Sequence, residues 1–143
     1  MNEEKSKSTL ALMEQAIMIL VFAVAATLCV QAFVRANLYS GELYRRDRAV
    51  NLCQTAAETV KAKRGELTSA AILLDGEVSD GKLYLYYNKE WKTVGAGEAA
   101  YVLCMEEAGR SDSVVTARVC VTEKKSSEEL FALPVSWQEV ADE

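Results

Sequence analysis

An apolar run near the N-terminus constrains this chain more than any other feature of its sequence. Residues 16–30 contain no strongly polar side chain. In the longer stretch of residues 10–34, the only strongly polar side chains are those of Glu14, Gln15 and Gln31. As an α-helix the inner stretch would rise about 22 Å, short of the roughly 30 Å hydrocarbon core of a bilayer, whereas residues 10–34 are long enough to cross it. We therefore expect residues 10–34 to form a single transmembrane helix.

Glu14 lies inside that spanning length, about one helical turn from its end. A carboxylate in hydrocarbon is costly, so it needs a cation beside it or must become neutral, and such residues usually mark functional positions. The alternative is that Glu14 lies at the level of the lipid headgroups and is simply solvated. The residues alone leave both interpretations open.

Composition and charge narrow the classes of function. The 143 residues suffice for one small domain besides a membrane helix, and the chain contains no histidine. Histidine-dependent catalytic triads and the common zinc sites are therefore excluded, and no phosphate-binding loop or nucleophile elbow is present. Residues 1–74 have a net charge of +2 and residues 75–143 of −7, which argues against nucleic acid as a partner. We therefore expect that the protein is not an enzyme and that it binds no cofactor or metal ion.

The helical pattern continues beyond the apolar run. Residues 1–9 are polar, and we expect them to be an unstructured leader or N-terminal tail. Residues 35–65 are expected to form an amphipathic helix that continues the span and ends at Arg64-Gly65. Its apolar side chains recur at steps of three and four residues: Tyr39, Leu43, Val50, Cys53, Ala57 and Val60.

Residues 66–143 are predicted to form a small antiparallel sheet domain of four or five strands. Residues 66–74 are a short helix or a connector, turns follow at residues 75–81, and the apolar period then changes to two. The expected strands are 82–87 paired with 91–94, 100–106 paired with 114–122, and an edge strand 131–137 that contains Pro134. So small a sheet needs a cover, which the amphipathic helix offers. The fold class is therefore α+β: a long N-terminal transmembrane-plus-amphipathic helix packed on a small antiparallel β-sheet.

Two of the four cysteines could lie opposite each other in the second predicted hairpin. Cys104 and Cys120 are nearly symmetric about Asp112, the centre of their proposed hairpin. They could form a cross-strand disulfide outside the cytoplasm, and two reduced thiols are equally compatible with the sequence. Cys29 lies in the apolar run and Cys53 on the apolar helix face, where cysteine acts as a small hydrophobic residue.

The N-terminal region resembles the type IV pilin-like family, which comprises pilins, minor pilins and the pseudopilins of type II secretion. Members of that family carry a short polar leader with Lys or Arg, a cleavage site, and an apolar helix whose fifth residue is glutamate. Lys5 and Lys7 lie in the polar leader here, and Glu14 is fifth if the processed chain begins at Leu10. The sequence departs from the family at Thr9, where glycine is preferred, and at Leu10, which replaces phenylalanine or methionine.

The resemblance implies a function in assembly. Prepilin peptidase would cleave between Thr9 and Leu10, and Glu14 would pair with the amino terminus freed at Leu10 of a neighbouring subunit. The partners would be the lipid bilayer and other pilin-like subunits, contacted through the N-terminal helix. The chain would then be a membrane-anchored structural subunit of a type IV pilus or a type II secretion-type pseudopilus. Its sheet domain would lie outside the cytoplasm.

The arginines after the span favour a different arrangement. Arg35, Arg45, Arg46 and Arg48 outnumber the two lysines before the span, and the positive-inside rule would then place the C-terminal part in the cytoplasm. These arginines could contact anionic headgroups, or they could form a solvated helix face with Glu42 and Asp47 as partners. The alternative function is that of an uncleaved single-pass membrane protein whose β domain is a protein-binding module.

Overall fold

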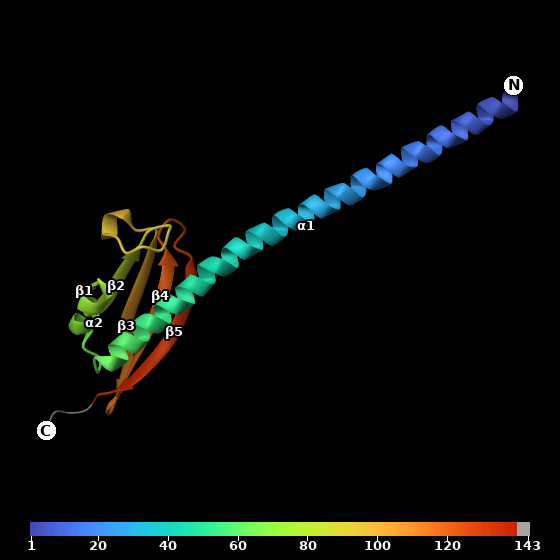
Figure 1. The fold of residues 1–143 in the computed structure, drawn as a ribbon. Coiled ribbons are helices and arrows are strands. Elements are labelled where there is room, and N and C mark those ends of the chain that lie inside the picture. The colour runs from blue at the N-terminus through green and yellow to red at the C-terminus, as the bar shows by residue number, and fades with distance from the viewer. Residues whose placement is uncertain (140–143) are drawn as a thin grey trace. The chain divides into compact units, whose positions relative to one another are not determined.

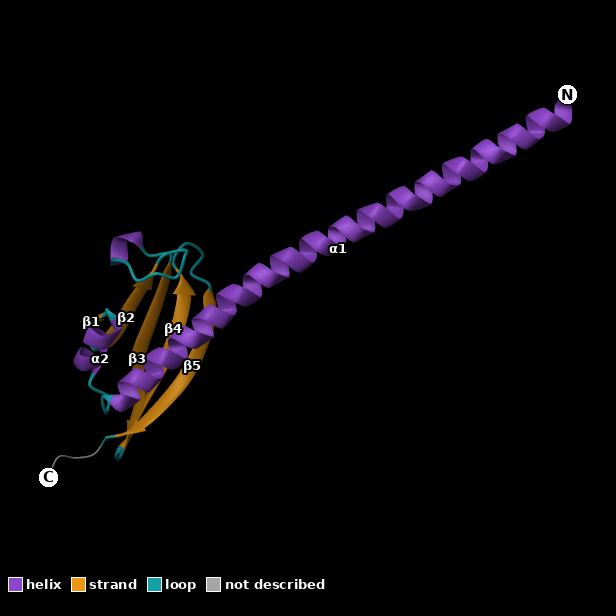
Figure 2. Cartoon of the chain, in the orientation of Figure 1, coloured by secondary structure: helices purple, strands orange, loops and turns teal. Residues whose placement is uncertain are grey.

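The computed structural model describes residues 1–139, which form two units, residues 1–42 and residues 43 onward. One helix, α1 (Asn2–Ala62), supplies all of the first unit except Met1 and continues into the second (Figures 1 and 2). The expectation that residues 1–9 are unstructured is wrong for Asn2 onward. Glu3 and Glu4 in the first turn favour the helix N-terminus, and adding turns to an existing helix costs far less than starting one.

The second unit is a five-stranded antiparallel sheet in which each strand pairs with the next along the chain. The last turns of α1 pack on one face of this sheet, so the predicted α+β class is confirmed. The remaining elements are α2 (Leu67–Leu74), β1 (Glu77–Ser79), β2 (Lys82–Tyr87), the short 3-10 helix η1 (Ala96–Glu98), β3 (Tyr101–Ser111), β4 (Val114–Glu123) and β5 (Glu129–Gln138).

The first hairpin differs from its prediction. Strand β2 has the expected bounds, but its partners are β1 and β3, and residues 91–94 contribute only an isolated bridge between Tyr87 and Thr93. The Asn88 side-chain oxygen accepts hydrogen bonds from the backbone N–H groups of Glu90 and Lys92, at 3.0 and 2.9 Å. This local turn competes with strand pairing, so the segment forms a loop.

The second hairpin is longer than predicted. The register shifts between Glu107 and Gly109, so the extra residue is accommodated as a bulge and β3 continues to Ser111. The turn therefore shrinks to two residues, with Asp112 in the left-handed region at φ 49°. Strand β5 lies at the sheet edge, and it contains Pro134 as the sequence predicted.

The hydrophobic core lies between α1 and one face of the sheet. Leu83, Leu85, Leu103 and Val119 are at most 1% exposed and alternate with more exposed residues along their strands. Of the six apolar positions predicted along α1, three are buried and Val50 is half-buried. Tyr39 and Leu43 are exposed, so the prediction is wrong for these two. The buried residues of α1 are Ala49, Cys53, Ala56, Ala57 and Val60.

Helix α1 ends as the sequence indicated. The backbone N–H of Gly65 donates to the carbonyl of Val60 at 2.9 Å, and both Arg64 and Gly65 have positive φ, at 54° and 86°. A left-handed residue after the last turn is a common way to satisfy the final carbonyls of a helix. This stop turns the chain toward α2.

Replacing Gly65 with alanine is expected to destabilise the sheet unit by about 2 kcal/mol, because alanine is strained at this positive φ and its Cβ would run into the indole of Trp137. The matched control is Gly97→Ala, at a position with an ordinary φ and no neighbouring atom within 4 Å of the added Cβ. Urea unfolding of the full chain in detergent micelles measures both variants. Equal midpoints for the two would contradict the steric argument.

Candidate functional site

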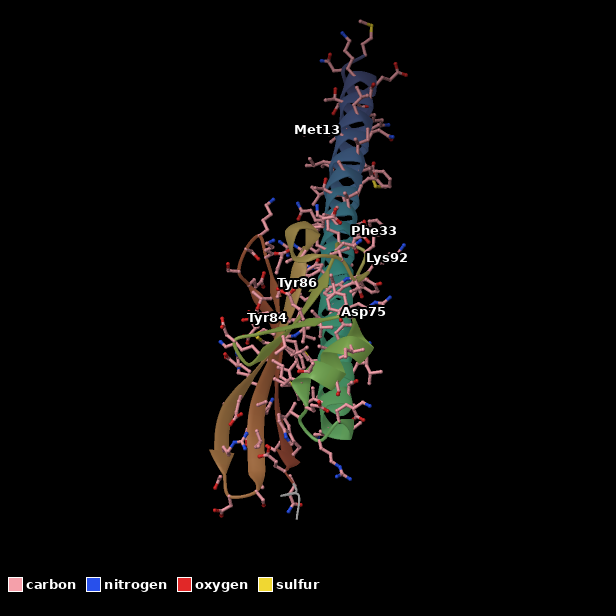
Figure 3. The ribbon with its side chains drawn as sticks, turned by 90° about the vertical axis from the view of Figure 1, so that its left-hand side faces the viewer. Met13, Phe33, Asp75, Tyr84, Tyr86 and Lys92 are labelled. Carbon is pink, nitrogen blue, oxygen red and sulfur yellow. The ribbon has the colours of Figure 1, made fainter. Side chains whose placement is uncertain are left out.

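The first unit presents an apolar helix surface that nothing in the described chain covers. Its 18-residue window of highest hydropathy averages 2.6, none of that window is buried, and the helix is long and apolar enough to cross a membrane. Leu10 is 63% exposed and Phe22 76% exposed. Figure 3 shows the side chains of Met13 and Phe33 projecting away from the helix. Large exposed apolar surfaces of this kind mark membrane or protein interaction sites.

Glu14 lies in the middle of an apolar patch on this surface. The side chains one turn before and one turn after it are Leu10, Ile17 and Met18, and together with Met13 they line a shallow groove around the carboxylate. Within the described residues, no hydrogen bond or ion pair reaches Glu14. A cation for Glu14 must therefore come from outside this part of the chain.

The proposed cleavage site lies within the same helix. Thr9 donates a hydrogen bond from its hydroxyl to the carbonyl of Lys5 at 2.8 Å, a bond made within one helical turn. Leu10 follows on the exposed helix surface, one turn before Glu14. The Thr9–Leu10 peptide bond is thus helical, and a peptidase that binds an extended chain would have to unwind this end.

The arginines beyond the apolar run make other contacts than those expected. Arg45 pairs with Glu123 of β4 at 3.4 Å. Arg48 donates to the Tyr44 hydroxyl at 3.1 Å, and its guanidinium lies 5.5 Å from the centre of that ring. The predicted partners Glu42 and Asp47 are wrong for these two arginines. The sequence could not predict the contact between Arg45 and Glu123, because these residues are 78 positions apart.

The sheet face opposite the core carries polar and aromatic side chains. Tyr84 and Tyr86 stack with ring centres 6.4 Å apart, and both are labelled on β2 in Figure 3. Tyr86 donates to a Glu77 carboxylate oxygen at 2.7 Å, and this hydrogen bond is the main cause that raises the pKa of Tyr86 to about 12. The Lys82 ammonium lies 2.6 Å from Glu106 and holds the pKa of that carboxyl below its usual range.

Cys104 and Cys120 are directly opposite each other in the β3–β4 register, as the sequence symmetry predicted. Both are half-buried free thiols in the structure. Their strand neighbours Leu103 and Val119 are fully buried against the core, so the two cysteines lie on the other face of the sheet. Burial is the main cause that raises the pKa of each thiol.

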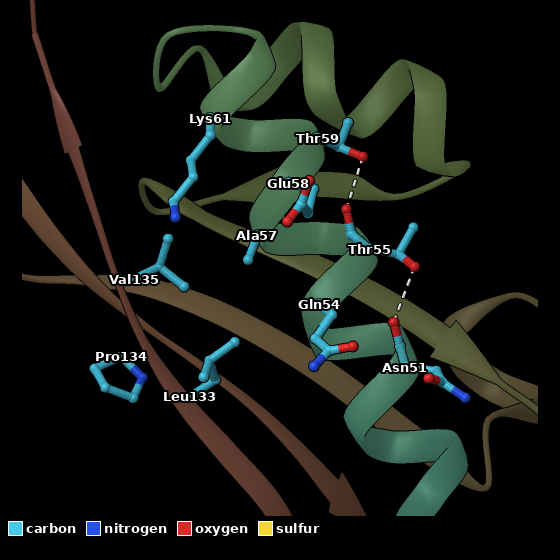
Figure 4. A pocket seen from close by; sticks show the side chains of 10 residues that line it. All are labelled: Asn51, Gln54, Thr55, Ala57, Glu58, Thr59, Lys61, Leu133, Pro134 and Val135. Carbon is cyan, nitrogen blue, oxygen red and sulfur yellow. Dashed lines mark hydrogen bonds between the residues drawn. The ribbon is translucent and has the colours of Figure 1, made fainter.

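A groove of about 770 Å³ lies between α1 and the edge strand β5 (Figure 4). The hydroxyls of Thr55 and Thr59 already donate to helix carbonyls one turn back, at 2.9 and 2.8 Å. Glu58 and Lys61 are its ionisable side chains, and they carry opposite charge. This groove contains no paired acid, nucleophile or phosphate-binding group.

Residues 1–139 contain no group of three or more side chains placed to bind a metal ion. No protein-family model, curated protein or solved structure matches the chain. A function for this chain is therefore inferred from the geometry of the helix and of the sheet unit. Glu14 is the feature that most clearly calls for a partner, because a carboxylate in apolar surroundings needs a cation beside it.

Proposed function

We propose that this protein is a membrane-anchored, pilin-like structural subunit that assembles with other subunits through its N-terminal helix. The assembly would be a type IV pilus or a type II secretion-type pseudopilus. The anchor would be α1, and the sheet unit would lie outside the cytoplasm. The proposal rests on Glu14 and its surroundings.

The supporting observation is a carboxylate among apolar neighbours that no cation of the described residues contacts. At spacings of three and four residues, the positions that can contact a helical side chain are occupied by Leu10, Ala11, Ile17 and Met18. Burying an unpaired carboxylate in a membrane costs several kcal/mol, and a cation from a second molecule would remove that cost. The α-amino group of a neighbouring processed chain is a cation of suitable size and depth.

The exposed apolar surface supports the same proposal. Helices associate in lipid by close packing, and small side chains let two backbones approach. Residues 23–27 read Ala-Val-Ala-Ala-Thr and follow the bulky Phe22. Ala23, Ala26 and Thr27 lie on one helix face, at spacings of three and four residues. Phe22 lies one turn from Ala26, and all of these residues are exposed, so this face is open to a neighbouring helix.

Co-isolation of two differently tagged copies tests the proposal directly. Both tags are placed at the C-terminus, the copies are co-expressed, membranes are dissolved in mild detergent, and one tag is captured. We expect the second tag to be recovered with the first. Recovery of one tag alone, with a monomeric mass in the micelle, would support the alternative of an uncleaved single-pass binding protein and contradict assembly.

Processing gives a separate prediction. Intact-mass measurement of the membrane-extracted protein is expected to show loss of residues 1–9 in at least part of the population. Thr9→Gly should increase the processed fraction, because it restores the glycine that the pilin-like family prefers and removes the hydroxyl that bonds to Lys5 within the helix. Thr27→Gly, which removes the same kind of hydroxyl-to-carbonyl bond farther along α1, is the control and should leave processing unchanged. A full-length mass for both variants would exclude cleavage at this site.

A further inference from the structure

Cys104 and Cys120 meet the geometric requirement for a covalent bond. Residues directly opposite in an antiparallel pair have Cα atoms about 4.5 or 5.5 Å apart, depending on the type of pair. Both values fall within the separation of roughly 4.4–6.8 Å that disulfides span. The β3–β4 register pairs these two residues directly, and the register shift of this ladder lies three residues beyond Cys104, between Glu107 and Gly109. The Cα separation expected for this pair is therefore one that a disulfide can span.

The other two cysteines lack such a partner. Cys53 is fully buried on α1, and burial is the main cause that raises its pKa to about 12, so it stays an unreactive thiol. Cys29 is in the first unit, on the exposed helix surface. Only the β3–β4 pair joins two adjacent strands at opposed positions.

We propose that Cys104 and Cys120 are joined by a structural disulfide that is introduced outside the cytoplasm by exchange with an oxidised dithiol oxidoreductase. The inference rests on the proposed function for the side of the membrane on which the sheet unit lies. A disulfide persists there, whereas cytoplasmic thiols are kept reduced.

The exchange proceeds in two balanced steps. The thiolate of one cysteine attacks the disulfide of the oxidoreductase, which forms a mixed disulfide and releases one thiolate of the enzyme. The thiolate of the second cysteine then attacks the sulfur of the first, which forms the Cys104–Cys120 bond and releases the second enzyme thiolate. Two electrons and two protons pass from the pair to the oxidoreductase. The half-buried position on the sheet surface leaves the pair accessible to that enzyme.

The bond would join the two strands at the centre of the sheet. It would close the loop that contains the bulge and the β3–β4 turn, and so restrict the unfolded chain. It lies on the face away from the core, so it would add stability without changing the packing under α1.

Differential alkylation of the full chain in cells tests the proposal. Cells are quenched with acid, and the protein is denatured and treated with N-ethylmaleimide before and after reduction. We expect two labels before reduction and four after it, because the chain has four cysteines. Cys53→Ser should reduce these numbers to one and three, whereas Cys104→Ser should give three labels both before and after reduction. Four labels on the unreduced protein would overturn the proposal.

A second measurement reports on the stabilising role. The purified full chain in detergent micelles is equilibrated with oxidised or reduced glutathione, and thermal unfolding of the sheet unit is followed. We expect the oxidised form to unfold at a temperature higher by roughly 10 °C, and the Cys104→Ser, Cys120→Ser double variant to show no difference between the two buffers. An identical unfolding temperature for the oxidised and reduced wild-type protein would overturn the stabilising role.

The proposed disulfide and the proposed assembly function can be contradicted separately. Co-isolation of tagged copies is measured in reducing buffer, so it depends on α1 and not on the bridge. A reduced pair with intact co-isolation would overturn the disulfide alone. An oxidised pair without co-isolation would overturn the assembly function alone.

Discussion

Glu14→Gln is expected to reduce co-isolation of tagged copies by about 100-fold, while the chain still inserts into the membrane. Glutamine keeps the size of the side chain and removes its charge. Removing one partner of a buried ion pair costs about 3–5 kcal/mol, because the other charge is left unpaired. Each 1.4 kcal/mol changes an equilibrium constant about tenfold, so a loss of two orders of magnitude follows. Quantitative immunoblotting of the captured fraction measures it.

Two variants on the same helix control for non-specific effects. Glu42→Gln removes an equal charge from α1 outside the apolar run, and Gln15→Ala removes the polar side chain next to Glu14. Both are expected to leave co-isolation within about twofold of the wild-type value. Carbonate extraction checks that all variants remain in the membrane. Undiminished co-isolation of Glu14→Gln would remove the assembly role of the carboxylate and favour a headgroup-level, solvated glutamate.

Leu103→Ala is expected to lower the free energy of unfolding of the sheet unit by about 3 kcal/mol. Leu103 is fully buried on β3, the middle strand of five, and faces the helix. Truncating a buried leucine loses transfer free energy and leaves a cavity, at a cost of about 2–5 kcal/mol. Small domains have a total stability of about 5–15 kcal/mol, so the loss is a large part of the whole. Urea unfolding of the full chain in micelles measures the shift.

Val102→Ala is the matched control for this prediction. Val102 precedes Leu103 on the same strand, points to the opposite face and is only half-buried. We expect a loss of less than about 1 kcal/mol for this variant. A similar loss at both positions would mean that the two faces of the sheet contribute equally, against the burial pattern of β3.

The sequence predicted the elements that local pattern controls. Helical spacing identified Cys53, Ala57 and Val60 as the inner face of α1, and strand β2 was found with its bounds. Ala49 and Ala56 were missed, because alanine is common on exposed and buried helix faces alike and gives no apolar signal. The pair Cys104 and Cys120 was predicted from its symmetry about Asp112. In the structure the two-residue turn alone would place Cys104 opposite Val121, and the bulge between Glu107 and Gly109 shifts the register by one residue to Cys120.

Contacts between distant residues were beyond the reach of the sequence. Strand β1 was read as turns, since three exposed residues show no alternation and are ordered only by pairing with β2. The pairing of Arg45 with Glu123 required the fold to bring α1 to β4. The rings of Trp91 and Tyr101 stack with their centres 4.0 Å apart. The sequence prediction assigned residue 91 to a strand and did not include this contact.

The sequence by itself determined the long helix and the single carboxylate within its apolar run, because hydrophobic period and length are local properties of the chain. The tertiary structure decided which residues surround each side chain. It left Glu14 without a partner in the described chain, placed Cys104 opposite Cys120 on the face away from the core, and paired Arg45 with Glu123 far along the sequence. These arrangements depend on the free energy of packing α1 against five strands, a sum over many distant contacts that no short stretch of sequence contains.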